Sequence, residues 1–174
     1  MIKSTLGNRL DSYLICLIRP IIRMGISPNT LTACSLIIAL FSGLSYGLGY
    51  VKTGGLLLAL SGLFDLLDGP VARFTGSESK FGAFMDSVFD RYSEIAVATG
   101  LCVYFASVQR IDGIVLTGLV LMGSINTSYA KARGENFIER CDIGLIERAE
   151  RIIILSAASL LNLLVPSLLL LALL

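Results

Sequence analysis

Long apolar stretches alternate with short polar segments along most of this chain of 174 residues. After residue 27, the apolar stretches cover about residues 29–49, 56–67, 81–107, 111–129 and 152–174. A helix needs about 20 apolar residues to cross the hydrocarbon core of a bilayer. We interpret Pro166 as the boundary between a fifth and a sixth span, because proline interrupts helices. The pattern therefore predicts about six transmembrane helices.

The first 25 residues have a different pattern. Apolar residues recur there at helical spacing from Ile2 to Ile21, and basic residues lie among them. This pattern predicts an amphipathic helix in the membrane interface rather than a cleaved signal peptide. Ser27 and Pro28 then provide an N-cap and a first helical residue for the first span. The predicted fold is all-α, with an interfacial helix over residues 1–25 and a single transmembrane bundle over residues 28–174.

The sixth span is short. From Pro166 to Leu174 it falls below the about 20 residues that a crossing needs, so we expect the last span to be truncated.

Composition supports a membrane protein and narrows its chemistry. The chain is 55% hydrophobic with 16% charged residues and a mean hydropathy of +0.79, far from an ordinary soluble domain. The net charge of +1 gives no reason to expect a nucleic-acid partner. The chain has no histidine, so any acid–base chemistry must come from carboxylates, lysine, tyrosine or cysteine.

Basic residues are distributed unevenly between the predicted loops. With the amino terminus inside, twelve lysines and arginines fall in inner segments, and only Lys52 and Arg110 fall outside. Cytoplasmic loops carry such an excess of positive charge. We therefore expect a multi-pass protein of the cell (plasma) membrane whose chemistry takes place at the cytoplasmic face.

Four aspartates interrupt the apolar sequence between the second and third predicted spans. They occur in the run Asp65-Leu-Leu-Asp68-Gly69-Pro-Val-Ala72-Arg73 and, eight residues later, in Gly82-Ala-Phe-Met-Asp86-Ser-Val-Phe-Asp90. One unpaired carboxylate in hydrocarbon costs at least about 2.5 kcal/mol, so four together need a strong compensating partner. A divalent cation is the obvious partner.

The spacing arranges these acids in two pairs. Asp65 and Asp68 are three residues apart, and Asp86 and Asp90 are four apart, so each pair lies on one face of its own helix. Two such helices side by side would bring four carboxylates together. Oxygen ligands suit Mg²⁺ or Mn²⁺ where substrate phosphates also bind, and four carboxylates predict two ions.

Two neighbouring residues favour a phosphate ligand. Gly69 allows a ligand to approach the backbone, and Arg73 can offer a planar donor fork to a phosphate. A structural role as helix caps, or as ion pairs with Arg73 and Arg91, explains a single aspartate more readily than four in two helically spaced pairs.

The pattern D-x2-D-G-x2-A-R-x8-G-x3-D-x3-D resembles the signature of the CDP-alcohol phosphatidyltransferases. The residues that match it are Asp65, Asp68, Gly69, Ala72, Arg73, Gly82, Asp86 and Asp90. The resemblance extends to the six-span plan and the amphipathic leader. It implies a homodimer that binds a CDP-linked lipid, such as CDP-diacylglycerol or CDP-archaeol, at a two-metal site and releases CMP.

The resemblance also implies roles for individual residues. The metal ligands would be Asp65, Asp68, Asp86 and Asp90. Asp90 would also be the catalytic base that takes the proton from the acceptor hydroxyl, so no histidine is required. The CDP-lipid site would comprise Pro28, Asn29, Thr30, Leu31, Asp68, Gly69, Ala72, Arg73, Ser79 and Gly82.

A cluster of basic residues indicates the chemistry of the acceptor. Lys131, Arg133, Arg148 and Arg151 fall at the same inner face, where cations bind phosphate by charge-assisted hydrogen bonds. From charge alone, contact with anionic lipid headgroups is the simpler interpretation. The sequences S-Y-x-K-A-R-x-E and E-R-x-E-R are, however, similar to those of phosphatidylinositol-phosphate and archaetidylinositol-phosphate synthases. That resemblance implies inositol 1-phosphate as acceptor and these four residues as contacts to its phosphate.

The leading hypothesis is therefore Mg²⁺-dependent transfer of a phosphatidyl or archaetidyl group to inositol 1-phosphate, in phospholipid biosynthesis. Glycerol 3-phosphate, serine and free inositol are alternative acceptors within the same chemistry. An intramembrane prenyltransferase also uses aspartate-rich helices, but the D-G-x2-A-R core has no place in it. A divalent-cation transporter would use the carboxylates as a transport site, yet would need neither Gly69 nor Arg73.

Overall fold

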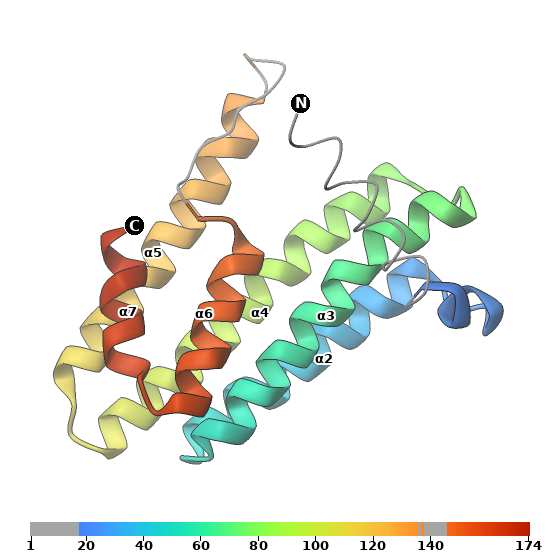
Figure 1. The fold of residues 1–174 in the computed structure, drawn as a ribbon. Coiled ribbons are helices and arrows are strands. Elements are labelled where there is room, and N and C mark those ends of the chain that lie inside the picture. The colour runs from blue at the N-terminus through green and yellow to red at the C-terminus, as the bar shows by residue number, and fades with distance from the viewer. Residues whose placement is uncertain (1–17, 136, 138–145) are drawn as a thin grey trace, which may run out of the picture.

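The computed structural model describes residues 18–135, 137 and 146–174, and over these residues the protein contains helices and no strand (Figure 1). Residues 18–23 form a short helix. The longer helices are α2 (Pro28–Gly47), α3 (Val51–Thr75), α4 (Lys80–Ser107), α5 (Ile111–Gly134), α6 (Arg148–Leu161) and α7 (Leu164–Leu173). The prediction of an all-α protein is confirmed.

Helices α2 to α7 pack into a closed ring. Helix α2 lies between α3 and α4, α6 packs against α3, α5 packs against α4, and α7 contacts both α5 and α6. Short turns at residues 48–50, 108–110 and 162–163 gather at one end of the bundle (Figure 1). The α3–α4 turn and the start of α6 lie toward the other end. Successive helices therefore run in opposite directions along the bundle.

Local sequence explains where these helices begin and end. Ser27 caps α2 by accepting a hydrogen bond from the Thr30 amide at 3.2 Å, and Pro28 is the first helical residue, as the sequence predicted. Ser79 caps α4 in the same way by accepting from the Gly82 amide at 2.9 Å. Gly76, with φ of 61°, ends α3 in the left-handed conformation that glycine adopts without strain.

Two predicted boundaries were wrong. Helix α3 is longer than residues 56–67 and continues through the aspartate run. Pro70 lies inside the helix, where it removes one intrahelical hydrogen bond without ending the helix. The break between the last two helices lies at Asn162 (φ 58°) rather than at Pro166. Asparagine tolerates this conformation, while Pro166 lies in the first turn of α7, where an intrahelical donor is not needed.

Three of the described helices, α2, α3 and α5, are long and apolar enough to cross a membrane. Helix α4 has 28 residues but carries several charged side chains, and α7 is a shorter apolar helix. The protein is therefore a helical membrane protein. Most of the predicted interfacial helix, residues 1–17, lies outside the described residues.

Two apolar clusters hold the bundle together. One, toward the end with the short turns, contains Tyr46, Leu101 and Leu168 from α2, α4 and α7. The other contains Ile18, Leu31 and Val71, and so fixes residues 18–23 against α2 and α3. One pair of serines links α2 and α3. The Ser35 hydroxyl donates to the backbone carbonyl oxygen of Ser61 at 3.0 Å, and the Ser61 hydroxyl donates to that of Ser35 at 2.9 Å.

Candidate active site

Helices α3 and α4 bring three of the four predicted metal ligands together. Carboxylate oxygens of Asp65, Asp68 and Asp86 lie within 4.8 Å of one another. Asp68 is buried, and the other two are partly buried. Three converging carboxylates are a donor set for a hard divalent cation, so these residues fit the ion that the family resemblance implies.

Asp68 is held in place by a residue that the sequence did not identify. The hydroxyl of buried Thr32 on α2 donates a hydrogen bond of 2.7 Å to Asp68 Oδ2. A carboxylate that accepts a fixed hydrogen bond has fewer orientations available. The only sequence signal was a polar residue in an apolar span, and such residues commonly bond their own helix.

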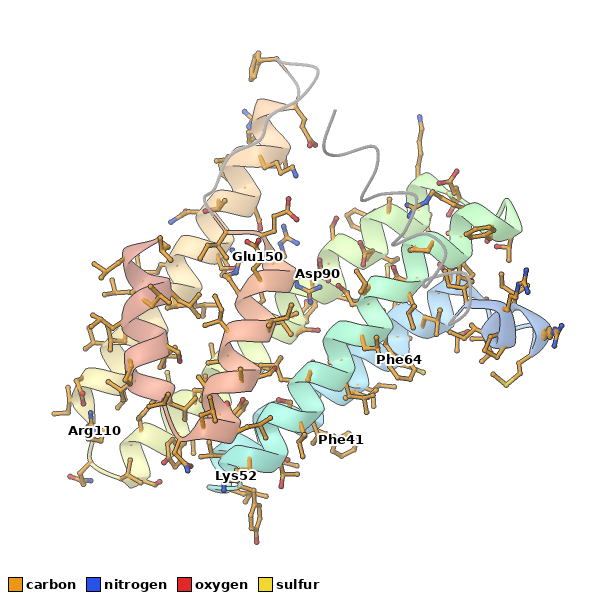
Figure 2. All side chains as sticks on the ribbon, viewed as in Figure 1. Phe41, Lys52, Phe64, Asp90, Arg110 and Glu150 are labelled. Carbon is orange, nitrogen blue, oxygen red and sulfur yellow. The ribbon has the colours of Figure 1, made fainter. Side chains whose placement is uncertain are left out.

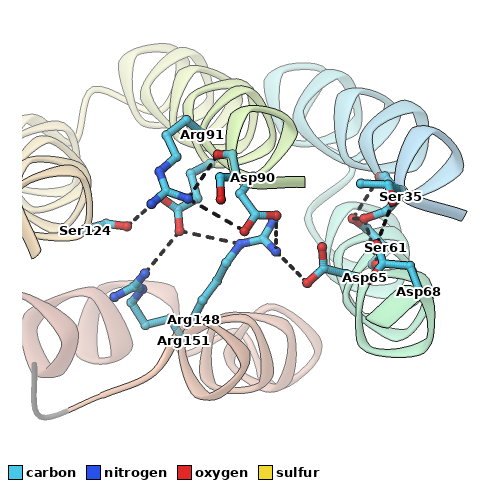
Figure 3. Close-up of polar contacts among 12 residues, drawn as sticks. Ser35, Ser61, Asp65, Asp68, Asp90, Arg91, Ser124, Arg148 and Arg151 are labelled. Atoms are coloured by element: carbon cyan, nitrogen blue, oxygen red, sulfur yellow. Dashed lines mark hydrogen bonds and ion pairs between the residues drawn. The ribbon is translucent and has the colours of Figure 1, made fainter. Parts of the chain in front are cut away.

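Asp90 lies beside an arginine of α6. Arg148 Nη1 is 2.6 Å from Asp90 Oδ1 and also 2.6 Å from Asp65 Oδ2, so one nitrogen contacts acids of both α3 and α4 (Figure 3). Asp90 is also 3.7 Å from Arg91. It is not one of the three converging acids, and Arg148 joins it to them.

A cavity of about 210 Å³ opens beside the acids between α2, α3 and α4. The residues of the predicted CDP-lipid site that line it are Pro28, Asn29, Asp68, Gly69, Ala72, Arg73, Ser79 and Gly82. The two others do not line it: Thr30 is exposed beside Ser27, and Leu31 packs into the apolar cluster with Ile18.

The two signature glycines keep this cavity open. Within 4 Å, a side-chain carbon at Gly69 would meet only the Arg73 guanidinium, at 3.7 Å. At Gly82, such a carbon would lie 3.0 Å from Ser79 Oγ and 3.4 Å from Asn29 Oδ1. Glycine at both positions leaves room for a ligand that contacts the backbone.

A second and larger cavity, of about 710 Å³, lies between α4, α5 and the start of α6. Lys131, Arg148 and Arg151 line it together with Asp90, whereas exposed Arg133 does not. Ser87, Thr127 and Ser128 are also among the residues that line it. Arg91 and the acids Glu135 and Glu147 line it as well, so this basic cavity has four cations against three acids and offers cationic donors to a polar anion next to Asp90.

Comparisons with known proteins agree with this geometry. Residues 25–173 match the family model of the CDP-alcohol phosphatidyltransferases. The chain is 39% identical over 140 residues to archaetidylinositol phosphate synthase of Pyrococcus horikoshii, which covers 80% of this chain and 72% of that one.

Solved structures match over most of the chain. The crystal structure of Mycobacterium tuberculosis phosphatidylinositol phosphate synthase with CDP-DAG bound has a TM-score of 0.79 and 31% identity, covering 92% of this chain and 86% of that chain. The structure of the same enzyme in complex with manganese and citrate has a TM-score of 0.80 and 31% identity, covering 92% and 82%.

The chain belongs to the CDP-alcohol phosphatidyltransferase family and is a membrane-embedded phosphatidyltransferase. The resemblance inferred from the aspartate signature is confirmed, and the acidic cluster together with the manganese complex of the tuberculosis enzyme indicates that this enzyme uses a divalent metal. The prenyltransferase and transporter alternatives are set aside.

Proposed function

We propose that the enzyme transfers a phosphatidyl or archaetidyl group from a CDP-linked lipid to a hydroxyl of inositol 1-phosphate and releases CMP. The observation that carries this proposal is the position of Arg148, which lines the basic cavity and contacts both Asp65 and Asp90. The acid cluster and the basic cavity are thus adjacent. The named activities of the relatives, which are inositol phosphate lipid synthases, support the same acceptor.

In the proposed reaction, an acceptor hydroxyl oxygen bonds to the lipid-side phosphorus and the P–O bond to the CMP phosphate breaks. Asp90 lines the basic cavity, so it faces the acceptor and takes the hydroxyl proton. Lys131, Arg148 and Arg151 bind the acceptor phosphate. Arg73, beside Gly69, binds the CDP-lipid on the other side of the acids.

We propose two Mg²⁺ ions as the cofactor, with Mn²⁺ able to replace them. Asp65, Asp68 and Asp86 would hold the metal, and Asp90 would complete the ligand set. When bound, the ions offset the diphosphate charge and stabilise the leaving phosphate. The manganese complex of the tuberculosis enzyme supports a divalent metal in this fold.

We place the active site at the cytoplasmic face of the plasma membrane. Lys52 and Arg110 lie near the end formed by the short turns, whereas Asp90 and Glu150 lie toward the other end (Figure 2). The remaining basic residues of the longer helices, from Arg73 to Arg151, belong to this second end. This asymmetry supports an orientation with the acids inside. A homodimer, implied by the family resemblance, completes the proposal.

The acceptor can be tested with the purified enzyme and Mg²⁺. CDP-diacylglycerol and CDP-archaeol are each supplied with inositol 1-phosphate, glycerol 3-phosphate, serine or free inositol, and released CMP is measured. We expect CMP release with inositol 1-phosphate and little with the others, because only this acceptor presents both a ring of hydroxyls and a phosphate to the basic cavity. Preferential turnover of another acceptor would overturn the proposal.

A further inference from the structure

Glu94 lies outside the family signature, one helical turn beyond Asp90 on α4. Asp86, Asp90 and Glu94 follow one another at intervals of four residues, so they share one face of the helix. Asp86 belongs to the metal site and Asp90 contacts Arg148. The third acid of this row has no role in the mechanism described so far.

The Glu94 carboxylate connects three helices. Arg151 Nη2 on α6 donates a hydrogen bond of 3.1 Å to Glu94 Oε1, and Arg148 Nε lies 3.7 Å from the same oxygen. On α5, the buried Ser124 hydroxyl donates to Glu94 Oε2 at 2.5 Å. Both oxygens are therefore engaged, and the Glu94 side chain is only 17% exposed. A charge-assisted contact shielded in this way is stronger than one at the surface.

Glu94 contacts the arginines from the interior of the bundle. Arg148 and Arg151 line the basic cavity, and both also line a smaller inner cavity of about 80 Å³. Glu94 and Ser124 line the inner cavity and are not among the described residues around the basic one. Because a guanidinium has five N–H donors, contact with Glu94 leaves donors free to face the basic cavity.

The two positive charges of Arg148 and Arg151 favour a neighbouring carboxylate. Arg148 and Arg151 are three residues apart on one face of α6, so their positive charges repel each other. Asp65 and Asp90 contact Arg148, whereas among the described residues the carboxylate in contact with Arg151 is that of Glu94. A guanidinium already fixed by a carboxylate loses less freedom when a phosphate binds.

We propose that Glu94 is a positioning residue that holds Arg151, and with it Arg148, in the orientation that binds the acceptor phosphate. This inference rests on the proposed function, since it assigns Glu94 to the binding of that acceptor. The role is indirect, because Glu94 acts through the arginines.

The first test is Glu94→Gln, which keeps the size of the side chain and removes its charge. We expect the KM for inositol 1-phosphate to rise about tenfold, the loss expected for one charge-assisted hydrogen bond. The KM for the CDP-lipid and kcat should change less than twofold. Ser124→Ala, a smaller change that releases Glu94 from α5, should raise the same KM by a lesser factor. An unchanged acceptor KM in both variants would overturn the inference.

A double-mutant cycle separates positioning from a general structural role. If Glu94 acts mainly through Arg151, Glu94→Gln should raise the acceptor KM by a smaller factor in Arg151→Ala than in the wild-type enzyme, because in that variant Arg148 is the one arginine of the pair left for Glu94 to hold. Additive effects would contradict the inference. A lower acceptor KM in Glu94→Gln would also contradict it, because that result would make Glu94 a competitor of the phosphate.

Asp112→Asn is the matched control. Asp112 is paired with Arg110 at 2.7 Å, far from the acids at the other end of the bundle, and the substitution should leave both KM values unchanged. If the wild-type enzyme turns over only another phosphorylated acceptor, the proposed function fails, and the Glu94 variants are then measured with that acceptor. If the wild-type enzyme uses inositol 1-phosphate and the variants behave like wild type, the Glu94 inference alone fails.

Discussion

Arg148 shows how one side chain can serve two neighbouring sites. Its guanidinium contacts Asp65 and Asp90, while its side chain lines the cavity assigned to the acceptor. Its Nε is buried without a hydrogen-bond partner and lies 3.7 Å from the Glu94 carboxylate. Acids and arginines therefore form one network between the two cavities.

Asp90 carries the first prediction at this scale. Asp90→Asn has the same shape but cannot take up the proton of the acceptor hydroxyl, so CMP release should fall by about 10²–10⁴-fold. CDP-lipid binding should largely remain, because Asp65, Asp68 and Asp86 keep their carboxylates. CMP release and equilibrium binding of labelled CDP-lipid measure the two effects separately. Asp112→Asn serves as the control, and wild-type turnover in Asp90→Asn would refute the assignment of the base.

Thr32 carries the second prediction. Thr32→Val preserves the shape of the side chain and removes the hydroxyl that donates to Asp68. We expect the affinity for Mn²⁺ to fall about tenfold, because partners of a metal ligand typically affect affinity by one to two orders of magnitude. Mn²⁺ titration followed by electron paramagnetic resonance measures this directly. Thr32→Ser, which restores a hydroxyl, should bind Mn²⁺ nearly as tightly as wild type, and equal loss in both variants would contradict the role.

Helices α2 and α4 approach each other closely. A side-chain carbon at Gly100 of α4 would meet the carbonyl oxygen of Gly43 on α2, and one at Gly43 would meet that of Ala96. Small residues allow helix backbones to come this close in membrane proteins. This contact fixes the height of α4 against α2, and so the position of Asp86 relative to Thr32, the α2 residue that donates to Asp68.

Gly100→Ala should therefore destabilise the bundle. The added methyl group cannot fit without moving backbone, and such overpacking costs about 1–3 kcal/mol. The midpoint of thermal unfolding in detergent should fall accordingly. Gly118→Ala is the control, because a side-chain carbon there has no neighbour within 4 Å. A lower midpoint in the control alone, or in neither variant, would show that the α2–α4 contact does not limit stability.

Sequence periodicity predicted the elements better than it predicted their partners. The intervals between Asp65 and Asp68, and between Asp86 and Asp90, follow from helix geometry alone, and both pairs lie on helices as expected. Glu94 and Thr32 could not be assigned in advance, because their roles depend on contacts with helices distant in sequence. The length of α3 was underestimated because the prediction followed the apolar stretch of residues 56–67, whereas the helix continues through the polar aspartate run.

For the whole molecule, the distribution of charge predicts the orientation in the membrane. In a variant without its four native cysteines, single cysteines are introduced at exposed Lys52, Arg110, Lys80 and Lys131. A membrane-impermeant maleimide added to intact cells should label positions 52 and 110 and leave positions 80 and 131 unlabelled until the cells are opened. Labelling of positions 80 and 131 from outside would invert the proposed topology.

The two cavities meet at neighbouring residues of α4, since one is lined as far as Asp86 and the other begins at Ser87. The row of acids thus separates the lipid nucleotide from the incoming alcohol. In the proposed reaction, the new bond forms on one side of the phosphorus while CMP departs toward the other, so a single transfer inverts the configuration at phosphorus. A chiral phosphate passing through such a site emerges with its handedness reversed.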